Sequence, residues 1–433
     1  MLRSRLQLGL LHVAVAMTLV PINSTLNRVM IKELAISATL VAILASLPYL
    51  FSPIQVAIGS FADRHPIWGL RRTPYIFAGL LLCVAGVVIS PFAAFLMAEN
   101  FWTGLGVGLL AFGAWGMGYN LSSVSYLSLA SELSGEKSRS KTIAIMFFMM
   151  ISAIIVTAIG LSHLVDPYTP QALVRAFWIV GLVSLILGLI GLIKLEKRQS
   201  TRPTSGDENY TWSTLMRFIF GNRQARLFFV YLIILLAAIL GQDILLEPFG
   251  AEAFGLSVRE TTRITSIWGM CVLFTLTVAG ALEGRVRKRA VVLWGGWTAL
   301  AGFVVITLSG LIDSLGIFYS GVVLLGLGTG LATVSNLSLM LDMTTAGSVG
   351  LFIGAWGMAN AFSRLIGSVL GGALRDSVTQ VVQNPVTGYL TVFVVEALLL
   401  LASLWLLGRI DVGAFRQKAY QQMSVLERAA SLE

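Results

Sequence analysis

Apolar runs of about 20 residues recur along the whole chain, and they constrain the fold more than any other feature of the sequence. Each run is long enough to cross a hydrocarbon core about 30 Å thick as one α-helix. Of the 433 residues, 56% are hydrophobic and only 12% are charged, whereas soluble domains carry about 25% charged residues. The sequence therefore predicts an all-α polytopic membrane protein.

Twelve transmembrane helices are predicted, arranged as two six-helix halves. The predicted spans are 7–27, 37–58, 74–97, 101–131, 142–164, 173–193, 225–245, 262–282, 290–310, 317–341, 349–374 and 388–408. The longest polar interruption separates the half 1–193 from the half 225–408, and forms a cytoplasmic linker, 194–224. Apolar residues at helical spacing predict interfacial helices in this linker and in the cytoplasmic tail, 409–433, where membrane contact is favoured over partner docking.

Three features could suggest another class of protein, and each has a membrane interpretation. The first residues resemble a signal peptide, but the apolar run is short and further spans follow, so we interpret them as an uncleaved first helix. Cys83 and Cys271 fall inside apolar runs and are predicted to be small hydrophobic residues, with neither a disulfide nor a metal. The net charge of +9 could suggest a nucleic-acid partner, which the charge distribution argues against.

The positive charge is concentrated on one predicted side of the membrane. With both termini cytoplasmic, the loops on that side hold 23 of the 30 Lys and Arg residues. This is the asymmetry of the positive-inside rule, and it also favours contact with anionic lipid head groups.

The two halves resemble each other at a constant offset of 210 residues. The segment 123–129, SVSYLSL, matches 333–339, TVSNLSL. The same offset pairs Gly116 with Gly326 and Gly118 with Gly328. Together with the six-plus-six layout, this predicts parallel repeats related by an axis along the membrane normal.

The loop between the second and third spans carries a recognisable pattern. The loop resembles the signature loop of the major facilitator superfamily. It has a glycine, an acid after three intervening residues, a basic residue, a second glycine and paired arginines, which are Gly59, Asp63, Arg64, Gly69, Arg71 and Arg72. In that interpretation the Asp63 carboxylate binds a neighbouring helix N-terminus and the arginines, and acts as a latch between the halves. The insertion of Pro66, Ile67 and Trp68 departs from the usual spacing. His65 has no partner at ligand spacing, so no metal site is predicted.

Three longer stretches, 24–34, 47–79 and 241–262, resemble the PucC-like bacteriochlorophyll delivery family, a branch of the same superfamily. The resemblance covers nearly the whole chain. It implies a role in assembling light-harvesting or photosystem polypeptides in a photosynthetic membrane, either thylakoid or intracytoplasmic, with a chlorophyll or bacteriochlorophyll pigment as the delivered molecule.

Polar residues inside the spans are few, and each is a functional candidate because intramembrane charge is expensive. A structural role is favoured over pigment ligation for His12, and backbone bonding over ligand coordination for Asn120 and Asn336. Asn23 and Asn27, with the neighbouring Ser24 and Thr25, are predicted to line a cavity. Asp243 and Glu247 lie four residues apart, before Pro248, which is expected to end the helix; a bond to Arg259 or Arg263 is favoured over a cation site.

Arg364 and Glu396 lie at similar predicted depths in antiparallel spans. One hypothesis is that they form a salt bridge. The other is that Glu396 provides an oxygen ligand to the magnesium of a pigment reaching it from the lipid side, with Arg364 balancing the charge.

No nucleophile with its base and no phosphate loop is evident, so we expect no enzyme. Two functions remain: a pigment-handling assembly factor, and a secondary transporter of a small, mostly apolar solute.

Overall fold

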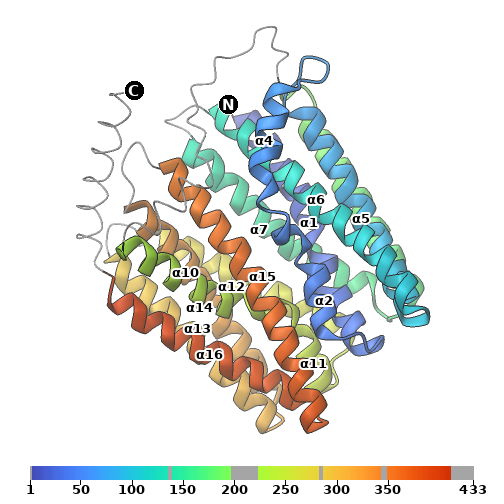
Figure 1. Ribbon diagram of the computed structural model, residues 1–433, viewed down its shortest axis with the longest axis vertical. Helices are drawn as coiled ribbons and strands as arrows, with labels where there is room; N and C mark the ends of the chain where they lie inside the picture. Colours follow the sequence, from blue (N-terminus) through green and yellow to red (C-terminus); the bar gives the residue numbers. More distant parts are fainter. Residues whose placement is uncertain (1, 135–138, 197–222, 282–285, 343–348, 411–433) are drawn as a thin grey trace.

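The computed structural model describes residues 2–134, 139–196, 223–281, 286–342 and 349–410, which fold into a bundle of long helices (Figure 1). The helices of the first half are α1 Leu2–Met17, η1 Pro21–Leu26, η2 Val29–Glu33, α2 Ala38–Ala45, α3 Leu47–Leu50, α4 Ile54–Arg64, α5 Thr73–Glu99, α6 Phe101–Ser134, α7 Arg139–Leu164 and α8 Pro170–Leu192. Those of the second half are α10 Arg223–Gly241, η4 Gln242–Ile244, α11 Leu246–Phe254, α12 Val258–Ala281, α13 Lys288–Leu311, α14 Leu315–Asp342, α15 Val349–Val382 and α16 Pro385–Gly408.

The all-α membrane fold predicted from the apolar runs is confirmed. Within the described ranges, 10 helices are long and apolar enough to cross a membrane. The two other predicted spans, 37–58 and 349–374, correspond to the broken series α2, α3 and α4 and to the 34-residue helix α15. The helix between residues 194 and 224 and the helix of the tail were predicted on residues that lie almost wholly outside the described ranges.

The two halves lie side by side, with the first half in blue to green and the second in yellow to red (Figure 1). α7 packs along α12, and α15 packs along α2, so these two helix pairs form the most extensive contacts between the halves. We call the end of the bundle that holds η2, α11 and the start of α2 the α11 end. The opposite end, which holds the loop between α4 and α5, is the latch end.

The glycines of the internal repeat make equivalent close contacts in the two halves. A Cβ added to Gly118 would lie 2.5 Å from the Gly79 carbonyl oxygen of α5, and one added to Gly328 would lie 2.3 Å from the Ala299 nitrogen of α13. Small residues let helices approach this closely, and backbone proximity is a main source of helix association in membranes. The offset of 210 residues therefore reflects one packing scheme used twice.

The first membrane segment of each half is interrupted. In the first half, the two π-helical turns η1 and η2 follow α1. In the second half, the 3-10 turn η4 separates α10 from α11. Interrupted helices at corresponding positions of two repeats point to the substrate region in transporter folds, because irregular backbone inside a membrane is tolerated where protein or a cavity surrounds it.

Pro248 does not end a helix, and the expectation that it does was wrong. It lies in the first turn of α11, where its missing N–H is one that the helix could not have bonded. The break comes earlier, at η4, and α11 ends before Gly255, whose φ of 64° is the left-handed geometry of a helix C-terminus.

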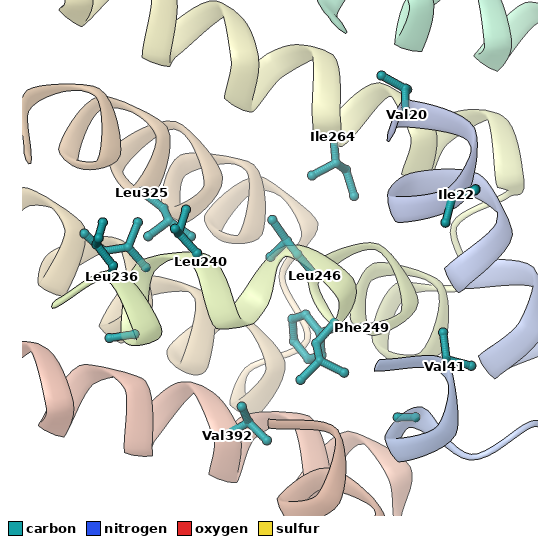
Figure 2. Packing of buried hydrophobic residues seen from close by; sticks show 14 of the residues in the cluster. Val20, Ile22, Val41, Leu236, Leu240, Leu246, Phe249, Ile264, Leu325 and Val392 are labelled. Carbon is teal, nitrogen blue, oxygen red and sulfur yellow. The ribbon is translucent and has the colours of Figure 1, made fainter. Parts of the chain in front are cut away.

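α11 is embedded in the core of the second half. The Phe249 ring lies 5.1 Å from that of Phe393 on α16 and 5.7 Å from that of Phe318 on α14, measured between centroids. Figure 2 shows Leu246 and Phe249 between helices of this half, with Val20 and Ile22 of the first half nearby. Side-chain packing thus fixes the orientation of α11 and of the polar residues next to it.

Candidate functional site

Polar contacts between the halves gather at the α11 end. The Ser24 hydroxyl donates to Glu247 Oε1 at 2.6 Å, and Thr25 and Thr262 hydroxyls lie 3.0 Å apart. Glu247 Oε1 also accepts from Thr265, so one carboxylate joins η1 to α11 and α12. Ser24, Thr25 and Glu247 are buried, and this part of the first segment packs against the second half.

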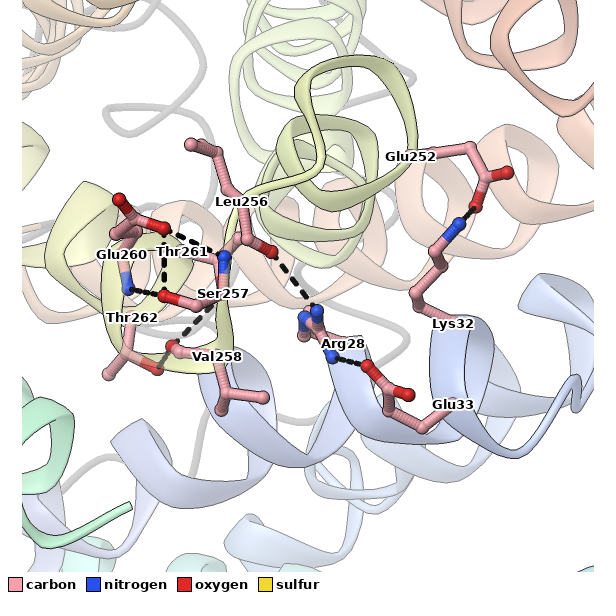
Figure 3. A network of polar contacts seen from close by, with 10 residues as sticks. All are labelled: Arg28, Lys32, Glu33, Glu252, Leu256, Ser257, Val258, Glu260, Thr261 and Thr262. Carbon is pink, nitrogen blue, oxygen red and sulfur yellow. Dashed lines mark hydrogen bonds and ion pairs between the residues drawn. The ribbon is translucent and has the colours of Figure 1, made fainter. Parts of the chain in front are cut away.

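A second group of contacts surrounds the turn between α11 and α12 (Figure 3). Arg28 donates to the Leu256 carbonyl oxygen at 3.1 Å and pairs with Glu33 on its own segment. Lys32 Nζ lies 2.6 Å from Glu252 Oε2. These bonds hold the two halves together at this end.

The predicted bond from Asp243 or Glu247 to Arg259 or Arg263 was wrong. Arg259 pairs with Asp166 of the first half, and Glu247 takes the Ser24 and Thr265 hydroxyls instead. The physical reason is the break at η4, which separates the two acids into different helices and destroys the four-residue register assumed for one continuous helix.

Asp376, on α15, caps a helix of the other half. Its carboxylate accepts from the backbone N–H of Ala38 at 3.2 Å and of Thr39 at 2.8 Å, and from the Thr39 hydroxyl at 2.6 Å. Arg375 Nη1 lies 2.9 Å from the same carboxylate. A carboxylate at a helix N-terminus meets unsatisfied N–H groups and the positive end of the helix dipole, so this cap stabilises the closed α11 end.

Replacing Asp376 with Asn is expected to loosen the α11 end, because the neutral amide accepts these bonds more weakly. We expect the population with separated halves at this end to rise about tenfold. Spin labels at the exposed positions Glu99 and Gln380, in a cysteine-free background, measure the distance across the boundary. Asp313→Asn, at an exposed position, is the matched control. An unchanged distance distribution in folded Asp376→Asn protein would contradict the role assigned to the cap.

An ion pair lies in the middle of the bundle, where the halves meet. Arg364 Nη1, near the middle of α15, lies 2.6 Å from Asp243 Oδ2 on η4, and the two side chains are 30% and 24% exposed. Gln242 donates to the other Asp243 oxygen at 3.0 Å. The Tyr49 ring of α3, in the first half, lies 5.6 Å from the guanidinium carbon. We call Arg364 and Asp243 the central ion pair.

The salt bridge predicted between Arg364 and Glu396 is wrong, because Arg364 pairs with Asp243. Glu396 is only 4% exposed, and its Oε2 has no hydrogen-bond partner among the described residues. Its Oε1 occupies the space beside Gly241, where a Cβ would be 3.0 Å away. Glu396 therefore faces α10 inside the protein, which also removes the lipid-side route by which a pigment was expected to reach it.

His12 is enclosed by aromatic rings. It is 6% exposed, and its centroid lies 5.1 Å from that of Tyr126 and 5.0 Å from that of Phe147. Its Nδ1 has no hydrogen-bond partner among the described residues, and the ring packs against its two aromatic neighbours, which favours a structural role. Both His12 and Glu396 are buried, which argues against either of them as an open axial ligand of a chlorophyll-type pigment.

The buried asparagines bond within the protein. Asn120 donates to the carbonyl oxygens of Pro48 at 2.8 Å and Gly116 at 2.7 Å, and accepts from Gln55. Asn336 donates to Ala332 at 2.7 Å and accepts from Tyr231 at 2.8 Å. The interpretation favoured for both, hydrogen bonding to the backbone, is confirmed.

The predicted cavity wall on the first segment was partly wrong. Asn23 is partly exposed, but Asn27 is fully buried and donates to the Asn23 carbonyl oxygen at 3.1 Å. The π-helical turns rotate this stretch toward α11 and α12, so that its polar groups join the halves.

The latch loop, residues 59–72, is bonded to its own half. Glu196 accepts from the backbone N–H of Arg71 at 2.7 Å and of Thr73 at 2.7 Å, and so caps α5. Arg72 Nη2 lies 3.0 Å from Glu132 Oε1 on α6. These contacts brace the first half. The Asp63 side chain lies outside what the structure describes, so the latch between the halves stays a prediction.

The inserted residues of this loop form a tight turn. The Ile67 N–H bonds the Leu70 carbonyl oxygen at 2.9 Å, with Trp68 at φ 54° and Gly69 at φ 74°. Gly69 is the residue type that this geometry favours. Arg64 and Trp68 are exposed, so the turn presents both side chains at the surface of the latch end.

Sequence reasoning missed Tyr49, Asp376, Glu196 and Glu132 as site residues. Tyr49 carries a local signal, since it follows Pro48 inside an apolar run where a helix must break. The three acids carry none, because each finds its partner across more than 55 residues of chain.

Comparison with known proteins agrees with this architecture. Residues 25–415 match the family described as PUCC protein. The chain belongs to the PUCC protein family. It is 32% identical over 416 residues to Protein PucC of Rhodobacter capsulatus, covering 92% of this chain and 90% of that one. It is 28% identical to the Bacteriochlorophyll synthase 44.5 kDa chain of the same species, covering 92% of each.

Solved structures show the same fold at low sequence identity. A bacterial homolog of the human lysosomal transporter Spinster, inward-facing and unoccupied, gives a TM-score of 0.72 at 13% identity, covering 96% of this chain and 97% of that one. A mutant of the nucleoside transporter NupG gives 0.70 at 16% identity, covering 94% and 99%. This PUCC family member therefore shares the fold of these transporters.

Proposed function

We propose that this chain is an assembly factor for light-harvesting or photosystem complexes, and that it handles a chlorophyll-type pigment in a photosynthetic membrane. The observation that carries the proposal is the match to the PUCC family over residues 25–415, which includes both halves and the central ion pair. The relative named for bacteriochlorophyll matches over 92% of both chains, which supports a tetrapyrrole as the handled molecule. The family match supports a photosynthetic membrane, thylakoid or intracytoplasmic, and the loop charges support an orientation with both termini cytoplasmic.

The chemistry of the boundary between the halves supports handling without catalysis. In the described ranges, no group of three or more His, Cys, Asp or Glu side chains could hold a metal ion. The other charged contacts described between the halves, such as Lys32 with Glu252, lie at the α11 end, whereas the central ion pair lies near the middle of α15. A single polar group at this depth suits a large, mostly apolar molecule with one polar group. We therefore propose no enzymatic step.

A second function, secondary transport of a small apolar solute, is favoured by one observation. The halves are hydrogen-bonded to each other at the α11 end, through Ser24 with Glu247 and Lys32 with Glu252. Such bonds suit a carrier in a state closed at that end, and the Spinster homolog with the similar fold is inward-facing.

Purification from the native membrane in mild detergent separates the two functions. The assembly function predicts tetrapyrrole absorbance in the purified protein and co-purifying antenna or photosystem polypeptides, and loss of those complexes from a deletion strain. Uptake of a solute into vesicles by protein that carries neither pigment nor antenna polypeptides would support the transporter and reject the assembly factor.

A further inference from the structure

We infer that Arg364 is an anion-binding residue that recognises a free carboxylate on the handled tetrapyrrole. This inference rests on the proposed function and names the group through which the pigment is bound. It replaces magnesium ligation, which was one of two hypotheses for Glu396 and the less favoured one for His12, because both side chains are buried in the protein.

The first argument is the unused bonding capacity of Arg364. A guanidinium has five N–H donors in a planar fork, and the pair with Asp243 engages Nη1 at 2.6 Å. Nη2 and Nε bond none of the described residues, and neither is sealed from the surface. A carboxylate can therefore bind through two parallel hydrogen bonds while Arg364 remains paired with Asp243.

The second argument is the contrast with the other cations at the boundary. Arg28 is bonded to both Glu33 and the Leu256 carbonyl oxygen, and it is buried. Arg375 is bonded to Asp376 and stacks over the Tyr389 ring at 4.7 Å, with 13% of its side chain exposed. The Nε of each is also unbonded, but it is buried in the protein, whereas the unbonded donors of Arg364, near the middle of α15, are not.

The third argument is the setting of the central ion pair. Asp243 lies on the interrupted helix at η4, and Tyr49 lies on the four-residue helix α3 in the broken second segment. The site thus combines two helix breaks and both halves, which is the location expected for a ligand that both halves hold. The aromatic face of Tyr49 next to the cation suits a planar, apolar ring system carrying an acid group.

Chlorophyllide a and its methyl ester test this inference, since they share one macrocycle and differ in the free propionate. Binding to the full-length protein in phosphatidylcholine nanodiscs is measured by quenching of tryptophan fluorescence. We expect wild-type protein to bind the acid at least about tenfold more tightly than the ester. Arg364→Gln should abolish this preference, Arg364→Lys should keep part of it, and Arg175→Gln, an exposed control, should leave it unchanged.

The double variant Arg364→Gln with Asp243→Asn guards against misfolding, because it removes both charges together. We expect it to bind acid and ester equally, at the affinity that the wild-type protein has for the ester. Equal binding of acid and ester by the wild-type protein would overturn the inference while leaving pigment handling intact. If the wild-type protein binds neither the acid nor the ester, both the inference and pigment handling are overturned. Co-purification of antenna polypeptides would then be the remaining test of the assembly function.

The anion could also come from a lipid phosphate, and the same assay separates this source. In phosphatidylglycerol nanodiscs, the preference for the acid should persist if the pigment carboxylate is the ligand. The preference could instead disappear in phosphatidylglycerol nanodiscs, while phosphatidylglycerol leaves pigment binding by Arg364→Gln unchanged. That result would show that the guanidinium binds a lipid head group, and it would overturn the inference.

Discussion

Replacing Gly118 with Val should severely destabilise the first half. The new Cβ would lie 2.5 Å from the Gly79 oxygen and 2.6 Å from the Cys83 nitrogen, and both are backbone atoms that cannot move without shifting α5. Overpacking of this kind costs about 1 to 3 kcal/mol when side chains can adjust, and we expect the upper end or complete loss of folding for this variant. Thermal unfolding followed by size-exclusion chromatography of detergent-solubilised protein provides the measurement.

Gly113→Val is the matched control, on the same helix, because a Cβ there meets nothing within 4 Å. Gly328→Val should reproduce the Gly118 result in the second half, where the Ala299 nitrogen is 2.3 Å from the new Cβ. Equal unfolding temperatures for Gly113→Val and Gly118→Val would show that α5 and α6 are not packed as described.

Replacing Arg364 with Met should leave Asp243 as an uncompensated charge in the membrane interior. Breaking a buried pair costs about 3 to 5 kcal/mol, and we expect about 2 to 3 kcal/mol because both side chains are partly exposed. Adding Asp243→Asn should recover much of the loss, since the unpaired charge is then removed. The coupling in this double-mutant cycle, measured from unfolding in detergent, should be about 2 kcal/mol.

The cycle between Arg364→Met and Glu396→Gln discriminates between the two possible partners of Arg364. The structure gives Arg364 a bond to Asp243 and none to Glu396 among the described residues, so this second coupling should be clearly smaller. A larger coupling to Glu396 than to Asp243 would restore the salt bridge inferred from depth alone.

The interrupted segments explain why several site residues could not be paired from the sequence. Depth along a span is a one-dimensional coordinate, and it correctly placed Arg364 in the middle of α15. Its partner was decided by the turn at η4, which brings Asp243 toward α15 and leaves Glu396 beside Gly241. A small change of backbone direction there changes which acid meets the guanidinium, and no periodic pattern encodes that direction.

The latch loop shows the same division between local pattern and tertiary placement. The glycines, the acid and the paired arginines of the signature pattern were recognisable from the sequence, whereas the left-handed turn at Gly69 is seen only in the structure. The carboxylates that bind the arginines, Glu132 and Glu196, come from α6 and from the segment after α8. The motif named Asp63 as the acid of this loop, whereas Glu132 and Glu196 carry no local signal because their partners lie 60 and 125 positions away in the sequence.

What the sequence determined by itself follows from the bilayer. Every long apolar run must be a helix because the backbone has no other way to satisfy its polar groups in lipid, and the offset of 210 residues revealed the doubled packing through Gly118 and Gly328. The tertiary structure alone decided how the halves bind each other, through Ser24 with Glu247 and Asp376 with the start of α2. These bonds join residues more than 220 positions apart in the sequence. Their geometry depends on the helix breaks and on the distances between packed helices, which exist only in the folded protein.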